Sequence, residues 1–157
     1  GAYEPWMLFR KPIEEKTVAQ NLRKWGTGGL RRLNVDQPLP DIIQSGKTPM
    51  VEDAISNHPT VKPQQLLRIL VRSLLPLGKG QILDPFCGSG STIAACQAVG
   101  YDAIGVEVDE EYFSLLTMNI DEFSALYPKY KGETLDVPAE CLPAKSKYTE
   151  SRQTSLL

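Results

Sequence analysis

Apolar positions recur at regular spacing between residues 61 and 126, and this part of the chain predicts most of the regular structure. After the turn residues around Pro63, leucines and a valine recur at helical spacing, and they predict a helix that Pro76 and Gly78 end. Its apolar face consists of Leu66, Leu67, Leu70, Val71 and Leu74, and its other face of Gln64, Gln65, Arg68 and Arg72.

The stretch 81–109 predicts a strand, a tight turn, a helix and a second strand. It holds two short apolar runs, separated by a glycine-containing turn and a segment of small residues, and an acid stands at the end of each run. Gly100 predicts the end of the helix, because glycine readily takes the left-handed conformation. Two strands joined by a helical crossover form a parallel βαβ unit, and ligands bind at the carboxyl ends of such strands. We therefore expect an α/β fold whose ligand site includes Asp84, Gly88, Gly90 and Glu107.

The flanking segments are less regular. Asp109 predicts the N-cap of a last helix that reaches about Leu126, because acids in its first turn suit the helix dipole. Near the start, Trp6–Phe9 predicts a short strand, and a helical turn is expected around Val18–Lys24 within a loop-rich connection. Residues 47–57 predict irregular structure, and the composition beyond residue 127 predicts a loosely ordered tail.

The composition is that of an ordinary globular protein of one domain, with 157 residues, 41% hydrophobic and 23% charged. The apolar runs are too short to span a membrane and no amino-terminal signal segment is present, so we expect a cytoplasmic protein. Cys87, Cys96 and Cys141 lack CxxC spacing, which favours buried or half-buried free thiols over a disulfide or a metal site.

Charge is unevenly distributed, although the net charge is only −2. Three acids stand among the first 35 residues, against seven basic side chains, which are Arg10, Lys11, Lys16, Arg23, Lys24, Arg31 and Arg32. Such a segment can lie along nucleic-acid phosphates or can form a solvated face, and charge alone does not separate the two.

Two common binding motifs with a glycine-containing turn, one for phosphate and one for dinucleotides, fit this chain poorly. A phosphate-binding P-loop needs a lysine directly after its last glycine, whereas Ser91 follows Gly90 here. The dinucleotide fingerprint is half met, because Ile93 stands where close helix packing needs a small residue.

A cationic ligand fits the turn better. A carboxylate at Asp84 would repel a pyrophosphate, but it would attract the ammonium and sulfonium groups of S-adenosylmethionine. Gly88 and Gly90 let the backbone approach the methionine portion, and Glu107 can accept hydrogen bonds from both ribose hydroxyls. Taken singly, Asp84 also fits a turn-capping carboxylate and Glu107 a surface acid.

Three motifs stand in a distinctive order: HPTVKPQQLL at 58–67, DPFCGSGST at 84–92 and GVEVDEEY at 105–112. With YEPWMLFRKP at 3–12 and KWGTGGL at 24–30, they resemble the β subgroup of the amino-DNA methyltransferases, which modify N6 of adenine or N4 of cytosine. The resemblance covers roughly residues 3–112. It implies DNA methylation, as in restriction-modification, and part of a Rossmann-like S-adenosylmethionine-dependent fold with an incomplete sheet.

The resemblance also implies roles for particular residues. The donor-binding loop of the family corresponds to Asp84, Pro85, Phe86, Gly88, Ser89 and Gly90, its ribose-binding acid to Glu107, and its segment beside the donor to His58, Pro59, Thr60, Lys62 and Pro63. We interpret His58 as a turn residue that orders its loop rather than as a catalytic base. Lys62 is expected either to contact the donor carboxylate or a DNA phosphate, or to be a solvated charge.

The catalytic tetrapeptide of the family, of the type Asp/Asn/Ser-Pro-Pro-aromatic, is not found, because the sequence has no Pro-Pro dipeptide. In the β subgroup the catalytic half comes first, so we interpret the chain as the carboxyl-terminal portion. Residues 1–12 would end the catalytic half, and residues 13–57 would be a connector or a remnant of target recognition. Residues 58–126 would bind S-adenosylmethionine, and residues 127–157 would form the tail.

This interpretation implies that the chain is inactive alone and contacts DNA through a complete enzyme. The expected partners are an amino-terminal catalytic half or a second chain, with a homodimer as one form, and no catalytic residue or metal is assigned to this chain. Two alternatives stay open, namely a methyltransferase acting on a small molecule, RNA or protein, and a degenerate donor-binding or assembly module without catalysis.

Overall fold

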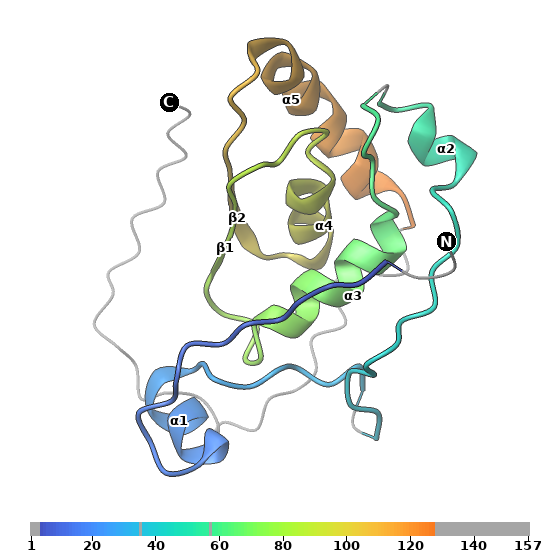
Figure 1. The fold of residues 1–157 in the computed structure, drawn as a ribbon. Helices are drawn as coiled ribbons and strands as arrows, with labels where there is room; N and C mark the ends of the chain where they lie inside the picture. Colours follow the sequence, from blue (N-terminus) through green and yellow to red (C-terminus); the bar gives the residue numbers. More distant parts are fainter. Residues whose placement is uncertain (1–3, 35, 57, 128–157) are drawn as a thin grey trace.

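The computed structural model describes residues 4–34, 36–56 and 58–127, so Cys141 and nearly all of the predicted tail lie outside the described residues. The elements of this part are shown in Figure 1 and follow in the order α1 (Val18–Trp25), α2 (Met50–Asp53), α3 (Gln64–Leu74), β1 (Gln81–Asp84), α4 (Ser91–Val99), β2 (Asp102–Gly105) and α5 (Glu110–Ala125). No helix among these residues is long and apolar enough to cross a membrane.

The central unit is the predicted parallel βαβ. β1 and β2 pair in parallel from Gln81 opposite Asp102 to Asp84 opposite Gly105, and α4 forms the crossover between them. Gly100 ends α4 with a φ of 77°, as predicted. The α/β prediction is therefore confirmed, and the site acids lie at one end of the strand pair, where Asp84 ends β1 and Glu107 follows β2 by two residues.

Helix α4 packs against the strand pair, and α3 and α5 pack against α4, so the three longer helices lie on one side of the strands (Figure 1). One buried cluster joins α3, β1 and α4, and consists of Leu67, Val71, Ile82, Ala95 and Cys96. A second joins α4 and α5 to the segment before α3, and consists of Val61, Ala94 and Phe123. Alanines and a cysteine on α4 allow close helix packing, and the prediction of buried free thiols is confirmed for Cys87 and Cys96.

The opposite face of the strand pair is open. Leu83 on β1 and its register partner Ile104 on β2 are exposed, and so is Val106 just beyond β2. β1 and β2 are the two strands of this sheet, so each has one edge without a paired strand in the described chain. Open edges and an apolar face are the features that pairing with further chain normally covers.

The predicted polar face of α3 is not simply a solvent face, because Gln64 and Arg68 are buried. Arg68 reaches the end of α5 and donates to the carbonyls of Phe123 at 3.0 Å and Ser124 at 3.3 Å. The last carbonyls of a helix lack partners within the helix, and a cation satisfies them well. Packing against α5 therefore overrides the two-sided pattern of α3.

The strand predicted at Trp6–Phe9 is not formed within the described chain, where these residues belong to no strand and their side chains are exposed. A strand needs a paired neighbour for its backbone groups, and the described chain offers none here. The segment runs beside the start of α3 instead, where Glu4 forms an ion pair with Lys62 at 2.8 Å.

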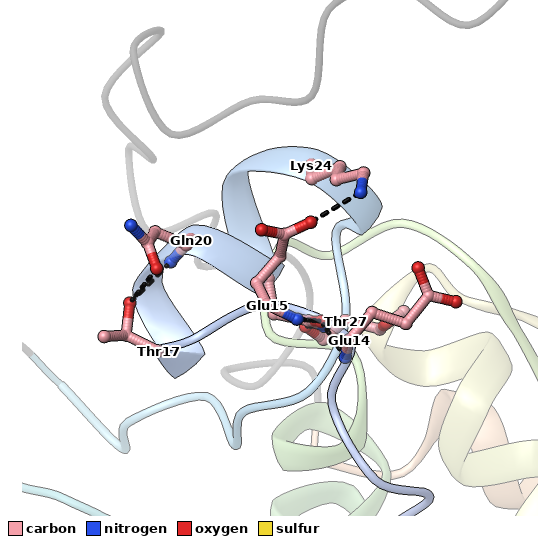
Figure 2. Close-up of polar contacts among 7 residues, drawn as sticks. Glu14, Glu15, Thr17, Gln20, Lys24 and Thr27 are labelled. Carbon is pink, nitrogen blue, oxygen red and sulfur yellow. Dashed lines mark hydrogen bonds and ion pairs between the residues drawn. The ribbon is translucent and has the colours of Figure 1, made fainter.

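Helix α1 confirms the expected helical turn and extends it by one residue, from Val18 to Trp25. The Thr17 side chain caps its start by accepting from the Gln20 N–H at 3.2 Å. Asn21 is buried, accepts from the Glu14 N–H at 3.1 Å and donates to the Thr27 carbonyl at 2.8 Å. Figure 2 shows this small unit, in which polar side chains join the loops on both sides of the helix.

The start of α5 and the short helix α2 both bear on the site. Asp109 caps α5 as predicted, accepting from the N–H groups of Glu111 at 2.9 Å and Tyr112 at 3.0 Å. Helix α2, Met50–Asp53, lies in a segment that was predicted to be irregular, and its Glu52 side chain is fully buried. The segment around α2 therefore belongs to the core that supports the site.

Candidate functional site

The loop between β1 and α4, residues 84–90, has a fixed backbone path that we call the donor loop. The Asp84 carbonyl accepts from the Val106 N–H at 2.9 Å, and the Cys87 N–H donates to the Val106 carbonyl at 3.0 Å. The Gly90 N–H donates to the Cys87 carbonyl at 2.8 Å. The loop is thus tied to the segment beyond β2, which carries Glu107.

Both loop glycines have a conformation and surroundings that require glycine. Gly88 and Gly90 have φ values of 46° and 78°, in the left-handed region. A Cβ on Gly88 would lie 3.1 Å from the His58 ring, and one on Gly90 would lie 3.1 Å from the Ile120 side chain of α5. The donor loop is therefore held between the 58–60 turn and helix α5.

Glu107 binds the donor loop directly. Its Oε2 accepts from the Gly88 N–H at 2.8 Å, and its Oε1 accepts from the Asp109 N–H at 2.9 Å. These bonds, that from Asp109 first, lower the pKa of the Glu107 carboxyl. Each carboxylate oxygen has a second acceptor position, so an ionised Glu107 can also accept from a pair of ligand hydroxyls.

Asp84 gives the loop a second negative charge. Its Oδ1 accepts from the Phe86 N–H at 3.1 Å, which is the turn-capping role expected as an alternative. Burial, then the charges of Asp84 and Glu107, raise the pKa of the Cys87 thiol in the same loop. The Cys87 thiol therefore lies in a negative field to which both acids contribute, and such a field favours a cationic ligand.

The remaining residues of the donor loop are one buried serine and two exposed side chains. Ser89 is buried and its Oγ lies 2.6 Å from the Ser91 Oγ at the start of α4. Pro85 is exposed, and Phe86 keeps 87% of its surface accessible. The structure therefore brings the predicted loop residues together, with Phe86 as an apolar side chain that no described residue covers.

His58 lies beside the donor loop and orders its own turn. The Thr60 N–H donates to His58 Nδ1 at 3.2 Å, and the Thr60 Oγ1 lies 2.9 Å from the same nitrogen. The His58 ring also packs edge-on against Tyr112 of α5, with ring centroids 4.4 Å apart. These contacts agree with a turn residue, and they place the 58–60 segment against Gly88.

Lys62 contacts the amino-terminal segment. It pairs with Glu4, and both line a hollow of about 470 Å³ together with Trp6, Ile42 and Leu66. The contact that the structure gives to Lys62 is thus with the amino-terminal segment rather than with the donor loop.

Two buried residues near the loop were not predicted. The Gln64 backbone N–H donates to Glu52 Oε2 at 2.9 Å, and the Gln64 Nε2 donates to the Ser91 carbonyl at 2.9 Å. Gln64 was assigned to a polar helix face, and Glu52 stood in an irregular segment. No periodicity in the sequence distinguishes either from a solvated polar residue.

The chain matches known proteins over the same segments. Residues 3–118 match the family model described as DNA methylase, for N6 and N4 methyltransferases. The Type II methyltransferase M.HindIII of Haemophilus influenzae is 27% identical over 137 residues, which cover 82% of this chain and 44% of that protein. The Type II methyltransferase M2.DpnII of Streptococcus pneumoniae is 30% identical over 92 residues, covering 59% of this chain and 34% of that protein.

A third relative and a solved structure also match. The DNA adenine methyltransferase YhdJ of Escherichia coli is 44% identical over 71 residues, which cover 44% of this chain and 23% of that protein. Among solved structures, the M1.HpyAVI–SAM complex aligns with a TM-score of 0.48 and 25% identity, over 59% of this chain and 44% of that one. The chain thus spans less than half the length of each of these relatives. Because the family model covers well over half of its residues, the chain belongs to the DNA methylase family, and the predicted membership among the amino-DNA methyltransferases is confirmed.

Proposed function

We propose that this chain is the S-adenosylmethionine-binding portion of a DNA methyltransferase that transfers a methyl group to the exocyclic amine of adenine (N6) or cytosine (N4). The observation that carries the proposal is the bond between Glu107 and the Gly88 N–H, with Asp84 at the other end of the same loop. Two carboxylates on a glycine turn disfavour a phosphate ligand and favour the sulfonium and ammonium of the methyl donor.

Each site residue has a role in this proposal. The donor loop, Asp84 to Gly90, takes the methionine portion, and Glu107 accepts from the ribose hydroxyls with its free acceptor positions. His58 and Thr60 support the loop from the side. Lys62 stays a candidate for the donor carboxylate or a DNA phosphate only if it leaves Glu4 when a ligand binds.

DNA as the substrate is supported by the relatives. M.HindIII and M2.DpnII are Type II methyltransferases, which supports a restriction-modification setting, and YhdJ is a DNA adenine methyltransferase, which supports adenine as one of the two targets. In the amino-terminal segment, Lys11, Arg23 and Arg32 are exposed and can lie along phosphates at the edge of a DNA cleft.

The base-binding half must come from elsewhere in the complete enzyme, because the chain has no Pro-Pro-aromatic tetrapeptide. An amino-terminal catalytic half or a second chain would cover the open face at Leu83, Ile104 and Val106 and pair with an open strand edge. In the assembled enzyme the extruded base and the donor are held in line. The amine nitrogen then attacks the methyl carbon while the bond between the methyl group and sulfur breaks, so the sulfonium becomes the neutral thioether of S-adenosylhomocysteine and leaves. The methylated amine gives up a proton to water or to a polar group of the catalytic half, and no covalent enzyme intermediate forms.

Isothermal titration calorimetry of the 157-residue chain with S-adenosylmethionine tests the donor site. We expect one site per chain, and Asp84→Ala and Glu107→Ala should each weaken binding by about 10- to 100-fold, as for hydrogen bonds to charged groups. Asp102→Ala is the matched control, because it removes an exposed carboxylate at the far end of β2. Absence of binding, or Asp84→Ala and Glu107→Ala behaving like the control, would overturn the assignment.

Methyl transfer separates the proposal from its alternatives. The chain alone should transfer no label from radiolabelled S-adenosylmethionine to DNA, and transfer should appear when a catalytic half with a Pro-Pro-aromatic motif is added. Labelling of RNA or protein in place of DNA would favour another substrate class. Donor binding without transfer to any substrate would favour a non-catalytic module.

A further inference from the structure

A series of buried polar groups runs from α2 through the start of α3 to the start of α4. Glu52 and Gln64 both have 0% of their surface exposed. Glu52 Oε2 accepts from the Gln64 backbone N–H, and the Gln64 Nε2 donates to the Ser91 carbonyl, each at 2.9 Å. Ser91 directly follows Gly90, so the series ends where the donor loop enters α4.

The Gln64 side-chain amide hydrogen-bonds the start of α4 with its nitrogen, and this orientation leaves its oxygen unsatisfied. Its Oε1 is buried without a hydrogen-bond partner among the described residues. An unsatisfied buried acceptor is unfavourable, and a leucine of similar volume would fill the space without it. The bond to Ser91 is thus the interaction that a glutamine provides here and an apolar side chain would not.

Glu52 fixes the other end of Gln64. Its carboxylate accepts the first N–H of α3, a group that has no partner within the helix, and a negative charge suits this helix end. Desolvation, then the Glu52 carboxylate beside its hydroxyl, raise the pKa of Tyr127 after α5. Glu52 is therefore held in the core, and it holds the backbone of Gln64 in turn.

We propose that Gln64, supported by Glu52, is a positioning residue for the methyl donor and fixes the end of the donor loop through the Ser91 carbonyl. This inference rests on the proposed function, because it assigns a role in donor binding to residues outside the donor loop. Neither residue touches the donor. They act by keeping the loop in the conformation that receives it, so that binding does not have to order the loop.

The test compares two glutamines of α3 and α4 by calorimetry with S-adenosylmethionine. Gln64→Leu should weaken binding about tenfold, as for the loss of one buried hydrogen bond. Gln97→Leu is the matched control, because Gln97 Nε2 donates to Asp121 Oδ1 at 2.8 Å near the far end of α4. It should bind the donor like the wild type, and circular dichroism establishes that each variant is folded.

A second variant gives a readout that a purely structural role would not produce. In Gln64→Glu the new carboxyl group is buried, which raises its pKa, so its protonated form can donate to the Ser91 carbonyl and its ionised form cannot. Donor affinity of Gln64→Glu should be near that of the wild type at about pH 5.5 and about tenfold weaker at about pH 8.5. The ammonium of the donor also titrates in this range, so the change is measured relative to the wild type and to Gln97→Glu, which should show only that shared effect.

The outcomes separate this inference from the proposed function. If the wild-type chain does not bind S-adenosylmethionine, the proposed function fails and the inference fails with it. If the wild type binds, and folded Gln64→Leu binds equally well or Gln97→Leu loses as much affinity, only the positioning role is overturned. A Gln64→Glu variant whose affinity changes with pH no more than that of the wild type would overturn it as well.

Discussion

The βαβ region and the amino-terminal region of this chain are stabilised in different ways. In residues 61–126 regular elements bury Leu67, Val71 and Phe123, and polar bonds are added to that core. In residues 4–34 the side chains of Met7 and Phe9 are exposed, and polar side chains join the loops. The difference indicates that the donor-binding region has its own core, whereas the amino-terminal region relies on hydrogen bonds. Most of these bonds are local, and buried Arg31 joins the region to Ser73 and Tyr101.

Matched phenylalanine variants should show the largest contrast. Phe123 is fully buried against Val61 and Ala94, so Phe123→Ala should lower the free energy of unfolding by about 3–5 kcal/mol. Phe9 is exposed, so Phe9→Ala should change it by less than about 0.5 kcal/mol. Urea denaturation followed by circular dichroism measures both, and equal effects would show that the two regions share one core.

The sequence predicted the βαβ region well, because its signals are local. The strand-turn-helix order, the glycine end of α4 and the Asp109 cap each depend on residues close in sequence, and all are present in the structure. The donor loop followed from the same local pattern. The sequence did not predict the hydrogen bond between Gly88 of this loop and Glu107, because the pattern placed Glu107 at a strand end without giving its partner.

What the sequence missed depends on long-range contacts. The strand expected at Trp6–Phe9 has the right composition but no partner strand in the described chain, and composition cannot supply one. Gln64 and Arg68 were placed on a polar face, but their burial depends on segments 27 and 55 residues away. Glu52 lay in a segment without periodicity, so only the fold shows that α2 supports the site.

A glycine pair tests how tightly the donor loop is held. Gly88 and Gly100 both have left-handed φ values, but a Cβ on Gly88 would meet His58, whereas one on Gly100 would meet nothing within 4 Å. Gly100→Ala should lower the free energy of unfolding by about 1–2 kcal/mol, the cost of a left-handed alanine. Gly88→Ala should cost about 1 kcal/mol more, because the His58 ring must move.

The affinity of the two glycine variants for S-adenosylmethionine separates an effect on the site from an effect on stability. Gly88→Ala should weaken S-adenosylmethionine binding by more than about tenfold, since the Gly88 N–H no longer reaches Glu107 in the same geometry. Gly100→Ala should leave the affinity unchanged. Similar losses in both variants would show that the effect arises from α4 as a whole and not from the donor loop.

The hydrogen-bonded structure around α1, residues 14–28, should depend on Asn21. Asn21→Ala removes two part-buried bonds, the one from the Glu14 N–H and the one to the Thr27 carbonyl. We expect local opening that costs about 1–3 kcal/mol. Hydrogen exchange should accelerate for residues 14–28 and stay unchanged in β1, α4 and β2, whereas acceleration in both regions would contradict their independence.

The ion pair between Glu4 and Lys62 should show the smallest effect, although it joins the two regions. The Glu4 side chain is 60% exposed and the Lys62 side chain 38%, so solvent screens the attraction. A double-mutant cycle of Glu4→Ala and Lys62→Ala should give a coupling energy of about 0.5 kcal/mol or less in the free chain. The same Lys62→Ala variant tests the donor role of this lysine, since unchanged donor affinity would leave it as a tether for the amino-terminal segment or a contact to a DNA phosphate. A tenfold loss that Glu4→Ala does not share would show instead that Lys62 leaves Glu4 to bind the donor.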